Sequence, residues 1–157
     1  MRTKVKQWIV ICVAVFLVIN LIWYFNYQRY RSITKGYKKS PVNYYLAEDN
    51  YSLSISPPKY LRLQGSLSIT DNRYLTVVYW PKTFLFARQK CGVVIADEKN
   101  NTTFLFYVDD KLHYQEDESI QYTNDEMKKI NYLEKKNKRK LKCLDHIAKK
   151  EWAKILK

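Results

Sequence analysis

Hydrophobic and polar positions divide this chain into three parts with different periods. The first part is an apolar run over residues 8–25, in which Asn20 is the one polar side chain. A helix rising 1.5 Å per residue needs about 20 apolar residues to cross the hydrocarbon core of a bilayer. Trp8 and Trp23 lie near the two ends of the run, where aromatic side chains anchor spans at both interfaces. The pattern predicts a single transmembrane helix over residues 8–25, preceded by a short basic tail at residues 1–7.

A cleaved signal peptide is the main alternative for this segment. Its hydrophobic stretch would run about 7–15 residues and end at a site made of small residues. Here the run is longer, and residues 22–27 read Ile-Trp-Tyr-Phe-Asn-Tyr, with no small residue. A buried core helix is the weaker third reading, because a basic tail leads directly into the run. We therefore expect a retained signal anchor. Asn20 could bond a second copy of the helix or reach the interface.

Charges around the span do not agree on its orientation. Residues 26–39 carry more Lys and Arg than residues 1–7, which by the positive-inside rule favours a cytoplasmic C-terminal domain. The N-terminal tail, however, is short, basic and free of acidic residues, as in ordinary signal anchors. We expect a single-pass protein of the cell membrane with its C-terminal domain outside the cytoplasm.

Residues 26–48 follow the span as a basic, tyrosine-rich stretch. We expect a juxtamembrane tether, with Tyr27, Tyr30 and Tyr37 resting in the headgroup region while their hydroxyls stay in water.

The second part, residues 49–116, alternates apolar and polar positions with period two. Such alternation predicts strands with one buried face, and the serines of residues 52–56 would lie on the wet face. Gly65 falls within one apolar run and predicts a bulge or bend. Six or seven short strands at this spacing indicate an antiparallel meander, either a sandwich-like sheet or a partly open barrel. The expected strands cover residues 51–56, 61–69, 74–80, 84–87, 91–96, 102–108 and 112–115.

The third part, residues 124–157, changes to a helical period. Asn124 is the expected N-cap, and Asn137 interrupts the apolar stripe and is the expected site of a bend. We expect the stripe to pack on the parent domain, with a lipid-facing or partner-facing stripe as the alternative. The stripe consists of Ile130, Leu133, Leu141, Leu144, Ala148, Trp152 and Ile155. The fold class is therefore α+β: one transmembrane helix, a small antiparallel β domain and a long basic amphipathic C-terminal helix.

Basic charge is concentrated at the two ends of the chain. Residues 1–39 carry a net +8, residues 40–124 carry −2 and residues 125–157 carry +7, within a total of +13. A near-neutral middle makes nucleic acid an improbable partner, since nucleic-acid-binding modules usually carry the basic face on the folded domain itself. The C-terminal face fits anionic lipid or an anionic envelope polymer, with a solubilising face as the alternative. Its expected contact residues are Lys135, Lys136, Lys138, Arg139, Lys140 and Lys142.

Candidate chemistry is sparse. Cys143 and His146 share a helical face, but two ligands do not make a metal site, and we expect no metal and no cofactor. Outside the cytoplasm, Cys91 and Cys143 could form a disulfide or stay reduced. Acidic residues gather near the last strand, where a solvated turn is the simplest reading and a catalytic pair the alternative. This cluster consists of Asp109, Asp110, Glu116, Asp117 and Glu118, with His113 beside it.

Three functions remain open. The first is a non-enzymatic, single-pass membrane protein whose β domain engages a protein or envelope partner near an anionic surface. The second is a minor subunit of a pilus-like or secretion assembly, although the expected leader motif is missing and the helix is not expected to continue past the span. The third is an enzyme with an unrecognised acidic site, which would require a pocket holding several of Asp109, Glu116 and His113. An abundance of Lys, Asn, Tyr and Ile is typical of AT-rich bacterial genomes.

Overall fold

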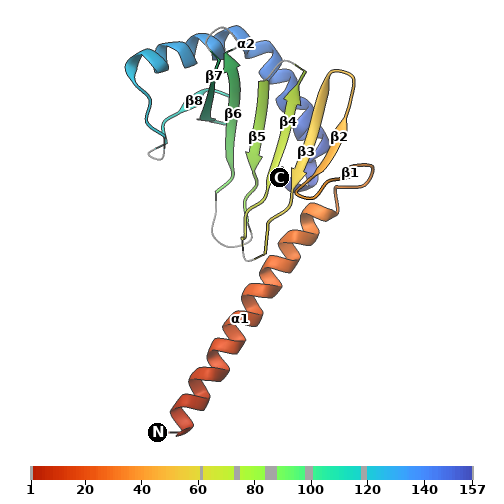
Figure 1. The fold of residues 1–157 in the computed structure, drawn as a ribbon, viewed down its shortest axis with the longest axis vertical. Coiled ribbons are helices and arrows are strands. Elements are labelled where there is room, and N and C mark those ends of the chain that lie inside the picture. The colour runs from red at the N-terminus through yellow and green to blue at the C-terminus, as the bar shows by residue number, and fades with distance from the viewer. Residues whose placement is uncertain are drawn as a thin grey trace.

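A computed structural model shows a long N-terminal helix, a β-sheet and a C-terminal helix packed on that sheet (Figure 1). The helices are α1 (Arg2–Arg31), α2 (Asn124–Glu151) and the short α3 (Ala153–Leu156). The α+β class predicted from the sequence is confirmed. The structure describes residues 2–60, 62–72, 75–83, 88–97, 101–117 and 120–156, with side chains from residue 6 onward.

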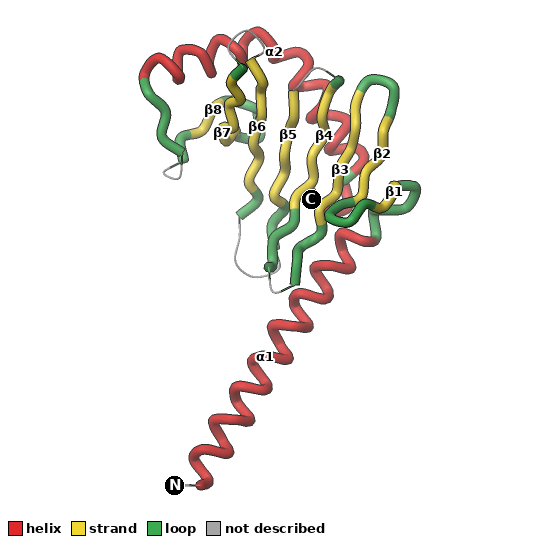
Figure 2. The backbone as a smooth tube through the Cα atoms, in the orientation of Figure 1, coloured by secondary structure: helices red, strands yellow, loops and turns green. Residues whose placement is uncertain are grey.

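The described strands form one antiparallel sheet of eight strands, in which each strand pairs with its neighbours in sequence (Figure 2). The predicted meander is confirmed, as a single sheet rather than a sandwich or a barrel, and the strand count is slightly higher than expected. The added strands β1 and β2 lie in the stretch that we predicted to be a tether. The predicted strand at residues 84–87 lies outside the described residues. The strands are β1 (Lys38–Lys39), β2 (Tyr44–Ala47), β3 (Tyr51–Ser56), β4 (Ser66–Asp71), β5 (Leu75–Trp80), β6 (Lys90–Asp97), β7 (Thr102–Val108) and β8 (Tyr114–Gln115).

Alternation along the strands separates a buried face from an open one. One row across the sheet pairs Leu53 with Ile69, Ile69 with Val77, Val77 with Val93, and Val93 with Phe106. All five side chains are at most 1 % exposed, so this row forms the centre of the core. The serines of β3 point to the other face and are exposed or half-buried, which confirms the predicted wet face.

The hairpin predicted between residues 91–96 and 102–108 is present as β6 and β7, with seven paired positions from Cys91–Val108 to Asp97–Thr102. Asn101 has φ 49°, a left-handed conformation that asparagine tolerates better than most residues. Two predicted strand starts were wrong: β4 begins at Ser66, with Leu63 in the preceding loop, and β8 begins at Tyr114, with Leu112 in the turn after β7.

Helix α2 covers the buried face of the sheet with its apolar stripe. All seven predicted stripe residues are buried, from Ile130 at 0 % to Leu133 at 8 % exposed. The stripe is therefore core and does not face lipid. The N-cap is Thr123 rather than Asn124: the Thr123 hydroxyl accepts a hydrogen bond from the backbone N–H of Glu126, whose carboxylate accepts one from the backbone N–H of Thr123.

Helix α1 does not end where the apolar run ends. It continues through Asn26 to Arg31, and both Asn26 and Tyr30 are buried, at 6 % and 1 % exposed. The predicted wet tether is therefore wrong for these residues. Gly65 explains the burial of Tyr30, because a Cβ at Gly65 would lie 2.9 Å from the tyrosine ring. The glycine allows a close approach of loop and helix and does not form a bulge within a strand.

Candidate functional site

Six exposed basic side chains of α2 form what we call the α2 basic surface. Every residue predicted to contact an anionic surface is exposed, as expected for the polar face of an amphipathic helix. Among the residues that the structure describes, Lys140 is the one member with a carboxylate in ion-pair range, with its Nζ 3.8 Å from Oδ2 of Asp71. The surface consists of Lys135, Lys136, Lys138, Arg139, Lys140 and Lys142.

The α2 basic surface lies at one end of the sheet. In a meander the turns alternate between two ends, and the β4–β5 and β6–β7 turns share the end that we call the top. Lys140 reaches Asp71 at the first of these turns, and Lys129 Nζ lies 2.7 Å from Asp97 Oδ2 at the second. Figure 1 shows α2 bending over this end before it descends along the sheet.

Helix α1 meets the domain at the opposite end, which we call the base. The β3–β4 loop and the β5–β6 connection lie there. Trp23 Nε1 donates to the carbonyl of Lys59 at 2.9 Å, and the Asn26 amide donates to the carbonyl of Leu63. Arg29 donates to the carbonyl of Lys82 at 3.1 Å and to that of Ile155 in α3 at 2.6 Å. Helix α1 is thus joined to the base by side-chain contacts as well as by the chain.

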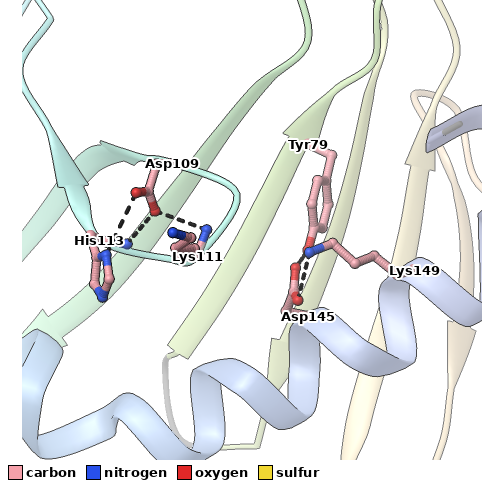
Figure 3. Close-up of polar contacts among 6 residues, drawn as sticks. All are labelled: Tyr79, Asp109, Lys111, His113, Asp145 and Lys149. Atoms are coloured by element: carbon pink, nitrogen blue, oxygen red, sulfur yellow. Dashed lines mark hydrogen bonds and ion pairs between the residues drawn. The ribbon is translucent and has the colours of Figure 1, made fainter.

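A polar cluster ties α2 to the sheet near the base ends of β5 and β6 (Figure 3). The Tyr79 hydroxyl donates to Asp145 Oδ1 at 2.5 Å, and Lys149 Nζ donates to Asp145 Oδ2 at 2.8 Å. Cys91 on β6 pairs with Tyr79 on β5. Burial raises the pKa of the Cys91 thiol to about 12, and the negative charge of Asp145 adds a smaller increase. Burial likewise raises the pKa of Tyr79. Groups held neutral in this way are poor nucleophiles, and the cluster acts as a structural link.

Asp109 organises the turn between β7 and β8 (Figure 3). Its Oδ1 accepts the backbone N–H groups of Lys111 at 2.9 Å and of His113 at 2.8 Å. These hydrogen bonds lower the pKa of the Asp109 carboxyl, and the one from the His113 backbone has the largest effect. The His113 Nδ1 lies 3.6 Å from Asp109 Oδ2, with both side chains partly exposed. The carboxylate is occupied as a turn cap, which agrees with the solvated-turn reading of the acidic cluster.

Only part of the acidic cluster lines a common hollow. A hollow of about 410 Å³ is lined by Asp109, Asp110 and Asp117 together with Lys90, whereas Glu116 and His113 do not line it. Lys90 Nζ lies 2.7 Å from Asp117 Oδ2, which neutralises part of that hollow. Glu118 lies outside the described residues. Among the described residues, no three His, Cys, Asp or Glu side chains are grouped as metal ligands.

All three cysteines are free in the structure, so the Cys91–Cys143 pair left open by the sequence is not bonded. The two thiols have different surroundings. Cys91 is half-buried beside Tyr79, and Cys143 is exposed at the rim of a hollow of about 610 Å³ near the top. His146 is exposed on the same helix.

Comparisons with protein-family models, with curated proteins and with solved structures find no match to this chain. Helix α1 is long and apolar enough over residues 6–31 to cross a membrane, with a mean hydropathy of 2.5 in its most apolar window and none of that window buried in the protein.

Sequence reasoning missed the contacts at the base and the Tyr79–Asp145 cluster. Asn26 gave a partial signal, since a polar residue that ends an apolar run while the helix continues needs a partner. Its acceptor, the carbonyl of Leu63, lies 37 residues away and no local pattern identifies it.

Proposed function

We propose that this chain is a non-enzymatic, single-pass membrane protein that holds the α2 basic surface away from its own bilayer, to engage an anionic partner. The observation that carries the proposal is the arrangement of α1 and the α2 basic surface at opposite ends of the sheet. Strand β4 has six residues at about 3.3 Å each, so the two ends are separated by roughly 20 Å.

This separation decides which anionic partner the surface fits. At physiological ionic strength the Debye length is about 8 Å, so charges more than two such lengths from the headgroups are largely screened from them. The lipid of the bilayer that α1 enters is therefore a poor partner for Lys136, Lys138 or Arg139. A polymer or protein that approaches from above the domain meets these side chains directly. A phosphate-rich envelope polymer or an acidic protein surface has the complementary charge.

Two features support retention of α1 as an anchor. The helix runs without interruption from the apolar run into the core, where Tyr30 is buried. Trp23, near the end of the run, also bonds the β3–β4 loop. Removal of the run would cost the domain the Trp23 hydrogen bond. We propose the cell membrane as location with the domain outside the cytoplasm, where envelope polymers are found.

The alternative of a pilus-like or secretion subunit gains one observation, because α1 does continue past the apolar run, contrary to our expectation. In such an assembly the N-terminal helices pack against one another. The polar atoms of Asn20 instead bond within this chain, to the carbonyl of Phe16 and to the hydroxyl of Tyr60, each at 2.8 Å. This arrangement favours the anchor over the assembly subunit.

The test uses the full chain in phosphatidylcholine nanodiscs and a soluble poly(glycerol phosphate) as the probe. One variant reverses Lys136, Lys138 and Arg139 to Glu. The matched control reverses Lys35, Lys38 and Lys39, which are exposed elsewhere and give the same change in net charge. We expect salt-sensitive binding that is lost in the first variant and kept in the control. Equal loss in both variants, or no binding by the parent chain, would contradict the proposal.

A further inference from the structure

Two connections at the base of the domain carry basic side chains that the α2 basic surface does not explain, whereas the β7–β8 turn at the same end carries Asp109 and Asp110. Residues 57–65 contain two basic and no acidic residues, and residues 81–90 contain three basic and no acidic residues. Of these five, Lys90 is paired with Asp117. The remaining four are exposed, and we call them the basal cations: Lys59, Arg62, Lys82 and Arg88.

The loop that bears two basal cations is fixed alongside the apolar run of α1. The Tyr60 hydroxyl donates to Asn20 Oδ1 at 2.8 Å, and the ring of Tyr60 meets that of Trp23 edge-on at 5.2 Å between centroids. Trp23 in turn donates to the carbonyl of Lys59 at 2.9 Å. Both helix residues belong to the apolar run, so the loop lies beside its last two turns and not above its end.

This position has a consequence for a chain anchored by α1. Asn20 lies five residues before Phe25, which corresponds to roughly 8 Å along the helix axis at 1.5 Å per residue. With the apolar run in the hydrocarbon core, Tyr60 reaches the boundary between acyl chains and headgroups. Tyr60 remains 55 % exposed, as suits an amphipathic residue at a membrane interface.

We propose that the base of the domain is a membrane-binding surface that docks on the leaflet from which α1 emerges, with the basal cations on anionic phospholipid headgroups. Two features identify the lipid leaflet as the partner of the base. The basal cations are complementary in charge to anionic headgroups, and the base is continuous with the proposed span. Lys and Arg side chains attract anionic headgroups within a Debye length. The contacts of Tyr60 with Asn20 and of Arg29 with the carbonyl of Lys82 place the two connections that carry the basal cations beside the end of the apolar run. The two basic surfaces then have separate partners, lipid at the base and a soluble anion at the top. The inference rests on the proposed span and does not depend on the partner at the top.

Docking also assigns a role to Asn20. Because its amide nitrogen and its carbonyl oxygen each have a partner within the chain, Asn20 positions Tyr60 at the interface. The base is thereby held against α1, and the domain cannot swing freely above the bilayer.

The first experiment measures the depth of the loop in nanodiscs that hold the full chain. A nitroxide is attached at Gln64→Cys, an exposed loop position, or at Lys138→Cys on the α2 basic surface, with the native cysteines replaced. Collision with oxygen, which partitions into lipid, is compared with collision with a water-soluble nickel chelate. We expect the label at position 64 to be shielded from nickel relative to that at position 138, and more strongly when phosphatidylglycerol is added to phosphatidylcholine.

The second experiment needs no cysteine replacement. The parent chain, K59E/R62E and the matched control K136E/R139E are extracted from mixed vesicles, and the co-purified lipid is measured. We expect enrichment of phosphatidylglycerol with the parent and the control and loss of that enrichment in K59E/R62E.

Equal nickel access at positions 64 and 138, or enrichment that is the same in all three chains, would overturn the docking proposal and leave the function of the α2 basic surface untouched. Failure of the chain to enter nanodiscs would instead overturn the span, and both proposals with it.

Discussion

Trp152 gives the sharpest test of how α2 is held on the sheet. Its side chain is fully buried at the end of α2, with an edge-on contact to Tyr79 at 6.4 Å between ring centroids. Its Nε1 donates to the Tyr37 hydroxyl at 3.2 Å, which ties the helix to the segment after α1. Had the apolar stripe of α2 faced lipid or a partner, removal of this ring would leave the isolated domain unaffected.

Trp152→Ala should cost the domain about 4 kcal/mol, within the range of roughly 3–5 kcal/mol that large-to-small core substitutions of tryptophan cost. A loss of this size is a large part of a typical domain stability of about 5–15 kcal/mol. Trp152→Phe keeps most of the buried area and should cost less, about 1–2 kcal/mol, from the lost hydrogen bond and a small cavity.

The assay is urea denaturation of the full chain in detergent, with unfolding monitored by the circular dichroism signal of the sheet. Trp8→Ala is the matched control, because Trp8 is 67 % exposed on α1 and should change the free energy of unfolding by less than about 0.5 kcal/mol. A loss under about 1 kcal/mol for Trp152→Ala would refute the packing that we describe.

Three further predictions follow from the capping box, the buried thiol and the exposed thiol. Thr123→Ala should lower the free energy of unfolding by about 0.5–2 kcal/mol in the same assay, because the N–H of Glu126 loses its acceptor; no change would contradict the cap. The pKa of Cys91 is raised from 9.0 to about 12, so the folded state holds this proton more tightly, and the contribution of Cys91 to stability should be constant below pH 9 and fall as the pH rises from 9 toward 12. This alkaline loss should be smaller in Cys91→Ala, and an identical pH profile would count against a buried thiol. In the native chain at pH 8, a thiol reagent should modify Cys143 at least tenfold faster than Cys91, measured by peptide mass spectrometry, and equal rates would contradict their assigned exposures.

The sequence predicted those features of the fold that depend on local periodicity. The stripe from Ile130 to Ile155 is the buried face of α2 and the short α3 that follows it, and the alternation in residues 51–56 is strand β3. Both patterns are strong because one face of each element packs against a continuous core. The N-cap prediction was off by one residue, since Thr123 and Asn124 are both good caps and tertiary packing selects between them.

The junction of α1 with the domain could not be predicted. Asn26 and Tyr30 resemble interfacial residues in the sequence, and they are buried because of the Leu63 carbonyl and the missing side chain of Gly65, both far along the chain. The predicted basic contact residues are exposed, but their position relative to the span depends on the direction in which α2 crosses the sheet. Periodicity carries no information about that direction.

The most direct test of the account is to ask whether α1 stays in the membrane as part of the intact chain. Membranes from cells that express the full chain are washed with alkaline carbonate, and the pellet and supernatant are analysed by intact-mass measurement. We expect the whole 18.9 kDa chain in the pellet, released by detergent alone. Recovery in the supernatant, or a pellet species shortened by the apolar run, would contradict it.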